Sequence, residues 1–187
     1  MIIVLLGASC SGKSLIQKVL SEEYGYEKII SYTTRTPRGK ERNGVDYFFI
    51  SDSIFKRMIE SDIFAEHDSY SQNRLYGTAR SDYNTNKDKV VVLTPNGLRQ
   101  LKRNCPNEKI FSILVDASLG TRIKRYIDRC GVENFTFDDK NEIAARVERD
   151  YGMFVGLEKE VDMILYNSEG AYIKDLVDEV IVNVVGY

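Results

Sequence analysis

The fold of this chain is decided by its opening stretch, Ile2-Ile-Val-Leu-Leu-Gly-Ala-Ser-Cys-Ser-Gly-Lys-Ser14. The run from Ile2 to Leu6 is continuously apolar and partly β-branched, which predicts a central parallel strand covered on both faces. The residues from Gly7 to Ser14 fit G-x-x-x-x-G-K-[ST], the pattern of a loop whose backbone N–H groups turn toward one phosphate. By chance such a match occurs in roughly one chain in a hundred of this length. Here it also lies between a predicted strand and a predicted helix, which is the context that the loop requires.

This loop predicts that the chain binds ATP together with Mg²⁺. The glycines permit the unusual backbone angles, and the following helix adds the positive end of its dipole. Lys13 is expected to reach the β and γ phosphates as a catalytic residue, and the Ser14 hydroxyl is the candidate Mg²⁺ ligand. The expected ATP-binding residues of the loop are Gly7, Ala8, Ser9, Cys10, Ser11, Gly12, Lys13 and Ser14.

Strand-like and helix-like segments alternate along the rest of the chain. Helices are expected at 13–23, at 52–61, from 97 to about 102, at 119–129, at 141–157 and at 171–179. Strands are expected at 89–94 and 111–115, further apolar runs lie at 161–166 and 180–185, and a polar loop is expected at 130–140. The alternation predicts an α/β fold with three layers, in which helices cover both faces of a mostly parallel sheet. Ligands of such sheets bind at the carboxyl ends of the strands.

Length and composition limit the classes of protein that this chain can belong to. The 187 residues suit a single α/β domain, and the formal net charge of −2 argues against a general nucleic-acid or membrane-surface role. The apolar run at the start is too short for a membrane span or a signal sequence. Three cysteines without a CxxC pattern and a single histidine suggest neither disulfides nor a zinc site. We therefore expect a cytoplasmic protein.

The polar segment from Ser31 to Tyr47 is dense in groups that suit an oxyanion. Arg35 and Arg38 offer planar forks that match phosphate, while Ser31 and Tyr47 offer hydroxyls. Pro37 stiffens the chain between the two arginines. On composition alone, a solvated basic loop is the alternative interpretation.

This segment resembles the guanylate kinase family, and the resemblance covers nearly the whole chain. It rests on the phosphate-binding loop, on Ser-x-Thr-Thr-Arg-Thr-Pro-Arg from Ser31 to Arg38, and on the Asn-Gly-x-Asp-Tyr that ends at Tyr47. The resemblance implies that Ser31, Arg35, Arg38 and Tyr47 hold the phosphate of guanosine monophosphate (GMP). It also implies that Phe64-Ala-Glu66 and Tyr76-Gly-Thr78 contribute Glu66, Tyr76 and Thr78 to the GMP site.

The chemistry of guanine suits two of these residues. Guanine presents its N1–H and its 2-amino group side by side, and the Glu66 carboxylate can accept hydrogen bonds from both. The Thr78 hydroxyl can donate to O6. Adenine has an acceptor at N1 and a donor at position 6, so it mismatches both residues and leaves buried groups unpaired.

The resemblance also implies a lid, and it divides the chain into three parts. A core of about 1–31, 89–118 and 158–187 would carry an acceptor-binding subdomain of about 32–88 and a lid of about 119–157. Arg125, Arg129 and Arg146 correspond to the family's lid and active-site arginines, which are catalytic candidates, whereas Arg122 and Arg149 have no clear match. Asn167 corresponds to a family residue near the adenine of ATP.

Two features depart from the family pattern. The family usually has Asp-x-Asp before the helix that contains Gly97, and the aligned residues here are Val92 and Thr94, which leaves Thr94 as the candidate GMP contact. The lid loop at 130–140 is longer than usual. Two alternatives therefore stay open. One is a related P-loop kinase for another nucleoside monophosphate or a phosphorylated sugar, and the other is a silent guanylate-kinase-like binding module.

Overall fold

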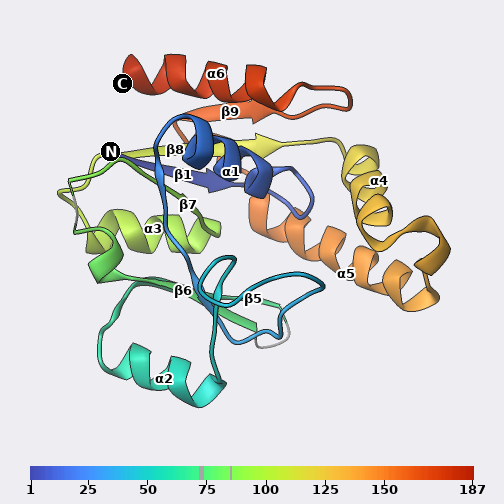
Figure 1. Cartoon of the computed structure of the whole chain (residues 1–187), viewed down its shortest axis with the longest axis horizontal. Coiled ribbons are helices and arrows are strands. Elements are labelled where there is room, and N and C mark those ends of the chain that lie inside the picture. Colours follow the sequence, from blue (N-terminus) through green and yellow to red (C-terminus); the bar gives the residue numbers. More distant parts are fainter. Residues whose placement is uncertain (72–73, 85) are drawn as a thin grey trace.

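The central sheet holds five parallel strands in the order β2-β7-β1-β8-β9 (Figure 1). This computed structural model describes residues 1–71, 74–84 and 86–187. The strands are β1 (Ile2–Leu6), β2 (Glu27–Lys28), β7 (Lys89–Val92), β8 (Ile110–Asp116) and β9 (Met163–Tyr166). The predicted α/β class is thus confirmed, and the sheet is parallel throughout rather than mostly parallel.

Alternate side chains of β1 enter the two hydrophobic layers of the core. Ile3 and Leu5 pack with α1 (Lys13–Glu23) and α6 (Ile173–Val185) on one face of the sheet. Ile2, Val4 and Leu6 face the other layer, which includes α3 (Pro95–Asn104). Every residue of β1 is buried, and full burial of one such side chain contributes about 1.5–3 kcal/mol. The phosphate-binding loop therefore begins from a firmly held strand.

A second sheet, in the order β4-β3-β6-β5, lies apart from the first and carries α2 (Asp52–Glu60) (Figure 1). Its strands are β3 (Tyr32–Thr33), β4 (Phe48–Phe49), β5 (Phe64–Ser71) and β6 (Arg74–Ala79). The long strands β5 and β6 were not predicted. Glu66, Asp68 and Tyr70 occupy alternate positions of β5. The residues between them are His67 and Ser69, so polar and apolar residues do not alternate and the sequence gives no strand signal.

The region between β8 and β9 consists mainly of α4 (Leu119–Cys130) and α5 (Phe137–Phe154). The loop that we expected at 130–140 is wrong in its extent, because α5 begins at Phe137 rather than near 141. A capping box explains the early start: the Thr136 hydroxyl accepts from the Asp139 N–H, and the Asp139 carboxylate accepts from the Thr136 N–H. Short 3₁₀ helices lie at Arg80–Asp82, Val132–Asn134 and Leu157–Lys159.

The last expected element also needs correction. The apolar run at 180–185 is not a separate element, because α6 continues without interruption to Val185. Leu176, Val177, Val180 and Val184 are its buried residues, and their spacing of three to four residues is that of a helix. Among the described helices, none combines the length and the apolar character needed to cross a membrane.

Candidate active site

The phosphate-binding loop has a backbone that only glycine can adopt at two positions. Gly7 has φ 143°, and a Cβ placed there would lie 2.3 Å from the Val115 carbonyl oxygen. Gly12 has φ 105°, and its Cβ would lie 2.1 Å from Asn167 Nδ2. Cys10 also adopts a left-handed conformation, with φ 62°. The loop thus wraps tightly between the end of β1 and the start of α1, as a cradle for phosphate does.

The Lys13 side chain folds back onto the phosphate-binding loop that contains it. Its ammonium donates to the carbonyl oxygens of Gly7 at 2.7 Å and Ala8 at 2.9 Å. Desolvation lowers the pKa of Lys13 to about 8, although the nearby Asp150 carboxylate opposes this shift. The amine remains mostly protonated near neutral pH and is available to an incoming phosphate.

A cavity connects this cradle to the predicted acceptor segment and to the helix α5, which belongs to the predicted lid. Its wall is polar and mostly charged, and it is built by residues that lie far apart in the sequence. The cradle contributes Gly7, Ser9, Cys10, Lys13 and Ser14; the acceptor segment and second sheet contribute Ser31, Arg35, Arg38, Tyr47, Glu66, Asp68, Tyr70, Arg74 and Tyr76; and further residues are Val92, Leu93, Thr94, Arg129, Glu142, Arg146, Arg149 and Phe154.

Cations gather around Arg38, at the end of this cavity that the predicted acceptor segment lines. Partial desolvation lowers the pKa of Arg38, and the neighbouring guanidinium groups of Arg35, Arg146 and Arg74 lower it further. Glu142 pairs with Arg146 at 2.7 Å and lies 3.9 Å from Arg74, so it neutralises only part of this charge. Such a concentration of planar cations is suited to a phosphate dianion.

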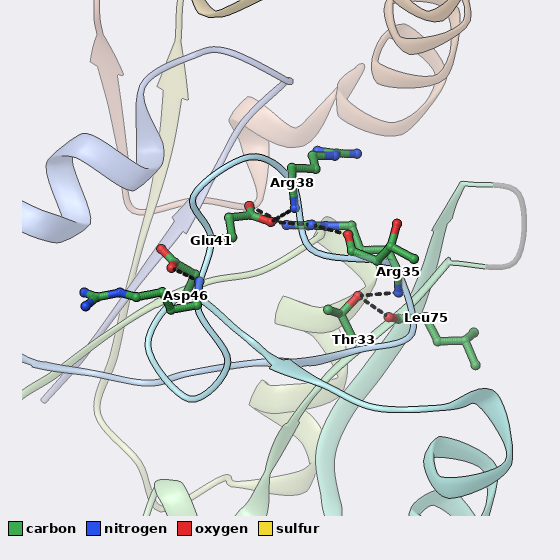
Figure 2. A network of polar contacts seen from close by, with 8 residues as sticks. Thr33, Arg35, Arg38, Glu41, Asp46 and Leu75 are labelled. Atoms are coloured by element: carbon green, nitrogen blue, oxygen red, sulfur yellow. Dashed lines mark hydrogen bonds and ion pairs between the residues drawn. The ribbon is translucent and has the colours of Figure 1, made fainter.

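A carboxylate that we did not single out in the sequence organises the acceptor loop. Glu41 accepts hydrogen bonds from both terminal nitrogens of Arg35, at 2.6 and 2.7 Å, and from the Arg38 N–H at 2.8 Å (Figure 2). The Arg35 guanidinium also lies 4.8 Å from the centre of the Tyr47 ring. Arg35 is therefore a buried and fixed member of the loop, whereas the Arg38 side chain extends away from Glu41 (Figure 2).

Glu66 is the most enclosed carboxylate on the cavity wall, with 4% of its surface exposed. The Thr78 hydroxyl donates to it at 2.8 Å, and the Tyr83 hydroxyl lies 2.7 Å behind Thr78. Burial raises the pKa of Glu66 to about 7, and the nearby Asp68 carboxylate adds to the shift. Gly97 makes room for this group, because a Cβ there would lie 2.6 Å from Glu66 Oε2.

Thr94 connects β7 to α3 beside Glu66. Its Oγ1 accepts from the Gly97 N–H at 3.0 Å and so caps α3, and it donates to Asp68 Oδ2 at 2.5 Å. Asp68 lies two residues from Glu66 on β5 and lines the same cavity.

A buried carboxylate of α5 joins three parts of the molecule beside the cradle. Asp150, with 2% of its surface exposed, accepts from the Ser9 N–H of the cradle at 2.8 Å. It also accepts from the Tyr70 hydroxyl of β5 at 2.5 Å and from Arg122 of α4 at 3.2 Å. The helices α4 and α5, the second sheet and the cradle thus meet at one side chain, which the sequence did not bring to attention.

Comparison with known proteins decides the family of this chain. A family model described as guanylate kinase matches residues 1–171. The chain belongs to the guanylate kinase family. A guanylate kinase of Clostridioides difficile (strain 630) is 33% identical over 164 residues, which span 83% of this chain and 78% of that protein. A guanylate kinase of Syntrophus aciditrophicus (strain SB) is 31% identical over 178 residues, which span 89% and 86% of the two chains.

A solved structure agrees with the fold of this guanylate kinase family member. The crystal structure of guanylate kinase from Anaplasma phagocytophilum matches with a TM-score of 0.74 at 20% identity. The match covers all of this chain, 100%, and 85% of the other. At this level of identity the likeness concerns the fold alone.

Most of the predicted site residues of this guanylate kinase family member line the one cavity described above. Six do not line it: Ala8, Ser11, Gly12, Thr78, Arg125 and Asn167. Arg125 donates to Asn167 Oδ1 at 2.9 Å, and Asn167 Nδ2 donates to the Ser11 carbonyl at 2.8 Å. Both residues therefore contact the cradle outside this cavity, and the roles of Arg125 over the phosphoryl group and of Asn167 beside adenine stay predictions.

The wall residues that we missed have a signal in the sequence that can be recognised afterwards. On β5, the polar residues Glu66, Asp68 and Tyr70 follow a period of two. On α5, Glu142 and Arg149 lie four residues before and three residues after the predicted Arg146, which is the spacing of one helical face. Neither pattern is specific until the element type is known. Arg74 carried no signal that we can identify.

Proposed function

We propose that this member of the guanylate kinase family transfers the γ-phosphoryl group of ATP to GMP, giving ADP and GDP. The observation that supports this proposal is the continuous cavity that connects the cradle of Lys13 to the cation cluster around Arg38. Two phosphate-binding regions that face one cavity suit the transfer of a phosphoryl group between two nucleotides.

The acceptor base is proposed from the chemistry of Glu66. This buried carboxylate accepts hydrogen bonds but, when ionised, has none to donate, which matches the N1–H and 2-amino group of guanine. Thr78 is fully buried behind Glu66 and donates to it, so we assign Thr78 the task of orienting the carboxylate. This replaces the direct contact with O6 that the sequence suggested.

A magnesium ion fits the cavity at the cradle. Mg²⁺ in kinases commonly takes one or two protein ligands and completes its shell with water and phosphate oxygens. Ser14 offers an exposed hydroxyl beside Lys13 on the cavity wall, and within the described part of the chain no three His, Cys, Asp or Glu side chains form a metal-binding group. When bound there, the ion would neutralise charge on the ATP phosphates.

In the proposed reaction an oxygen of the acceptor phosphate forms a bond to the γ-phosphorus of ATP. The bond from that phosphorus to the β–γ bridging oxygen breaks, and ADP leaves with the electron pair. The attacking phosphate is already largely ionised near neutral pH, because its second pKa is about 6, so no general base is needed. The residues of the chain align the two phosphates and offset their repulsion, with Lys13 on the donor side, Arg38 on the acceptor side, and Arg129 and Arg146 between them.

The test is an acceptor panel. ADP formation is measured with ATP and Mg²⁺ alone and with GMP, AMP, CMP, UMP or a sugar phosphate, and kcat/KM is compared. We expect GMP to be preferred, and we expect Glu66→Gln to abolish most of that preference. A better rate with AMP or a sugar phosphate would favour the related-kinase alternative. ADP formation that never responds to an acceptor would favour the silent binding module.

A further inference from the structure

The only proton of the Thr94 hydroxyl is already engaged within the protein. It is donated to Asp68 Oδ2 at 2.5 Å, and the same oxygen accepts from the Gly97 N–H at 3.0 Å. A hydroxyl has one donor, so Thr94 cannot donate to a base without abandoning Asp68. The preceding wall residues on this strand end, Val92 and Leu93, present apolar side chains. The charged acceptor that this corner of the cavity offers to a ligand is therefore the carboxylate to which Thr94 donates.

That group is the Asp68 carboxylate. Oδ2 accepts from Thr94, and Oδ1 accepts from the Ser69 N–H at 2.8 Å. A carboxylate accepts about four hydrogen bonds, so room remains for about two more. Across the described residues no cation forms an ion pair with Asp68, although it lies on the wall of a cavity rich in arginines. Asp68 is thus a fixed acceptor with capacity for a ligand.

Asp68 also stands in a defined relation to Glu66. The two residues occupy alternate positions of β5, so both side chains project from the same face of the strand. They are close enough for Asp68 to act electrostatically on Glu66. The cavity therefore presents two acceptor groups side by side, Glu66 in its depth and Asp68 nearer the opening, since Asp68 is the less buried of the two.

We propose that Asp68 is a specificity-determining residue that accepts a hydrogen bond from the 2-amino group of guanine. This inference rests on the proposed function. The edge of guanine carries three hydrogens, one on N1 and two on the 2-amino group. A single carboxylate accepts the N1 hydrogen and one amino hydrogen, and the second amino hydrogen needs another acceptor. Asp68 supplies it, held in place by Thr94.

The inference distinguishes GMP from two close analogues. Inosine monophosphate (IMP) has the N1–H but no 2-amino group, so it keeps one hydrogen bond to Glu66, loses the other, and leaves Asp68 without a partner. Xanthosine monophosphate (XMP) has an oxygen at position 2, which both carboxylates repel. The change in discrimination among these purine monophosphates between the wild type and an Asp68 variant therefore measures Asp68, whereas discrimination against AMP measures Glu66.

The experiment compares kcat/KM for GMP, IMP and XMP on the wild type and on Asp68→Asn. We expect the ratio of GMP to IMP to fall by about tenfold to a hundredfold in the variant, because a hydrogen bond to a charged group is lost. XMP should improve relative to GMP. Thr94→Val should lower the ratio less, since the charge of Asp68 remains and only its orientation is lost. The KM for ATP should stay unchanged in both variants.

The matched control is Asp62→Asn, which alters an exposed carboxylate of the same subdomain that pairs with Arg80 outside the cavity. It should leave all three acceptors unaffected, and thermal unfolding should confirm that every variant is folded. An unchanged ratio of GMP to IMP in Asp68→Asn, with an active wild type, would overturn the role of Asp68 alone. A wild type that does not phosphorylate GMP would overturn the proposed function, and this inference with it.

Discussion

The two ends of the cavity are built in opposite ways. The cradle consists of consecutive residues from Gly7 to Ser14, and its shape is set by backbone angles that Gly7 and Gly12 alone can adopt. The acceptor end is assembled from side chains on a loop, on β5 and β6, at the start of α3 and on α5. A local structure of this kind can bind phosphate with little regard to the rest of a ligand, whereas the assembled one can be specific. In the function that we propose, recognition of the donor is thus a property of a segment, and recognition of the acceptor is a property of the fold.

The largest expected effect tests the end of the cavity formed by the cradle. Lys13→Ala should lower turnover by about a thousandfold or more, because it removes the cation that meets the charge developing on the transferred phosphoryl group. GMP binding, measured by calorimetry, should remain nearly intact. Lys18→Ala is the control, since Lys18 lies on the same helix with an exposed side chain that pairs with Glu22. A Lys13→Ala variant with more than a tenth of wild-type turnover would show that the cradle is not catalytic.

The second prediction tests the end of the cavity that is assembled from several elements. It changes Gly97, which leaves room for the Glu66 carboxylate. Gly97→Ala should reduce kcat/KM for GMP by about tenfold to a hundredfold, because the new Cβ would lie 2.6 Å from Glu66 Oε2 and displace the carboxylate. The end of a side chain can move, so the fold should survive. Gly120→Ala is the matched control, as a Cβ there meets nothing within 4 Å. Equal losses in the two variants would contradict the assignment of Glu66 as the base reader.

A smaller effect should separate the two substrates. Arg38→Lys keeps the positive charge but loses the planar fork, so the KM for GMP should rise by about tenfold while the KM for ATP changes little. Steady-state kinetics with each substrate varied in turn measures both constants. Arg42→Lys, an exposed arginine of the same loop, serves as the control. If both KM values rise together, Arg38 acts on the closed state as a whole and not on the acceptor phosphate.

The smallest effect concerns pH. Burial, with a further contribution from Asp68, raises the pKa of Glu66 to about 7, and hydrogen bonds from Thr78 oppose the shift. Only the ionised form accepts both guanine hydrogens, so affinity is lost as the pH falls through this value. Between pH 7.5 and 6.5 the dissociation constant for GMP should rise about threefold, in proportion to the lost ionised fraction. Glu66→Gln should keep only the weaker pH dependence that the phosphate of GMP contributes.

The sequence predicted what depends on neighbours in the chain. The β1 strand, the cradle and α1 were predicted correctly, because apolar continuity and glycine placement are local properties. The extent of α5 was wrong, since the Thr136–Asp139 capping box lies in a stretch that reads as polar loop. The predicted end of α6 was wrong because valines favour strands. The buried valines of α6 nevertheless have helical spacing, and their packing against the sheet stabilises the helix to Val185.

The site followed the same division. Motifs led to Lys13 and Arg38, which line the cavity and belong to segments with a recognisable pattern. They could not identify Asp68 or Asp150, whose importance depends on what the fold brings beside them: Thr94 in one case, the Ser9 N–H and Tyr70 in the other. Carboxylates are common in this chain, and no spacing distinguishes these two from the rest until the tertiary contacts are known.

The position of β1 in the middle of the sheet has a consequence for biosynthesis. Val4 pairs with Val91 on one side and with Ser112 on the other, and Gly7 closes against the carbonyl of Val115. A ribosome therefore releases the cradle long before the strands that flank it, and contacts between such distant residues form slowly. Until then the apolar run from Ile2 to Leu6 has no sheet to join. The cradle is synthesised before β7 and β8, and it cannot reach its final shape until β8 has emerged.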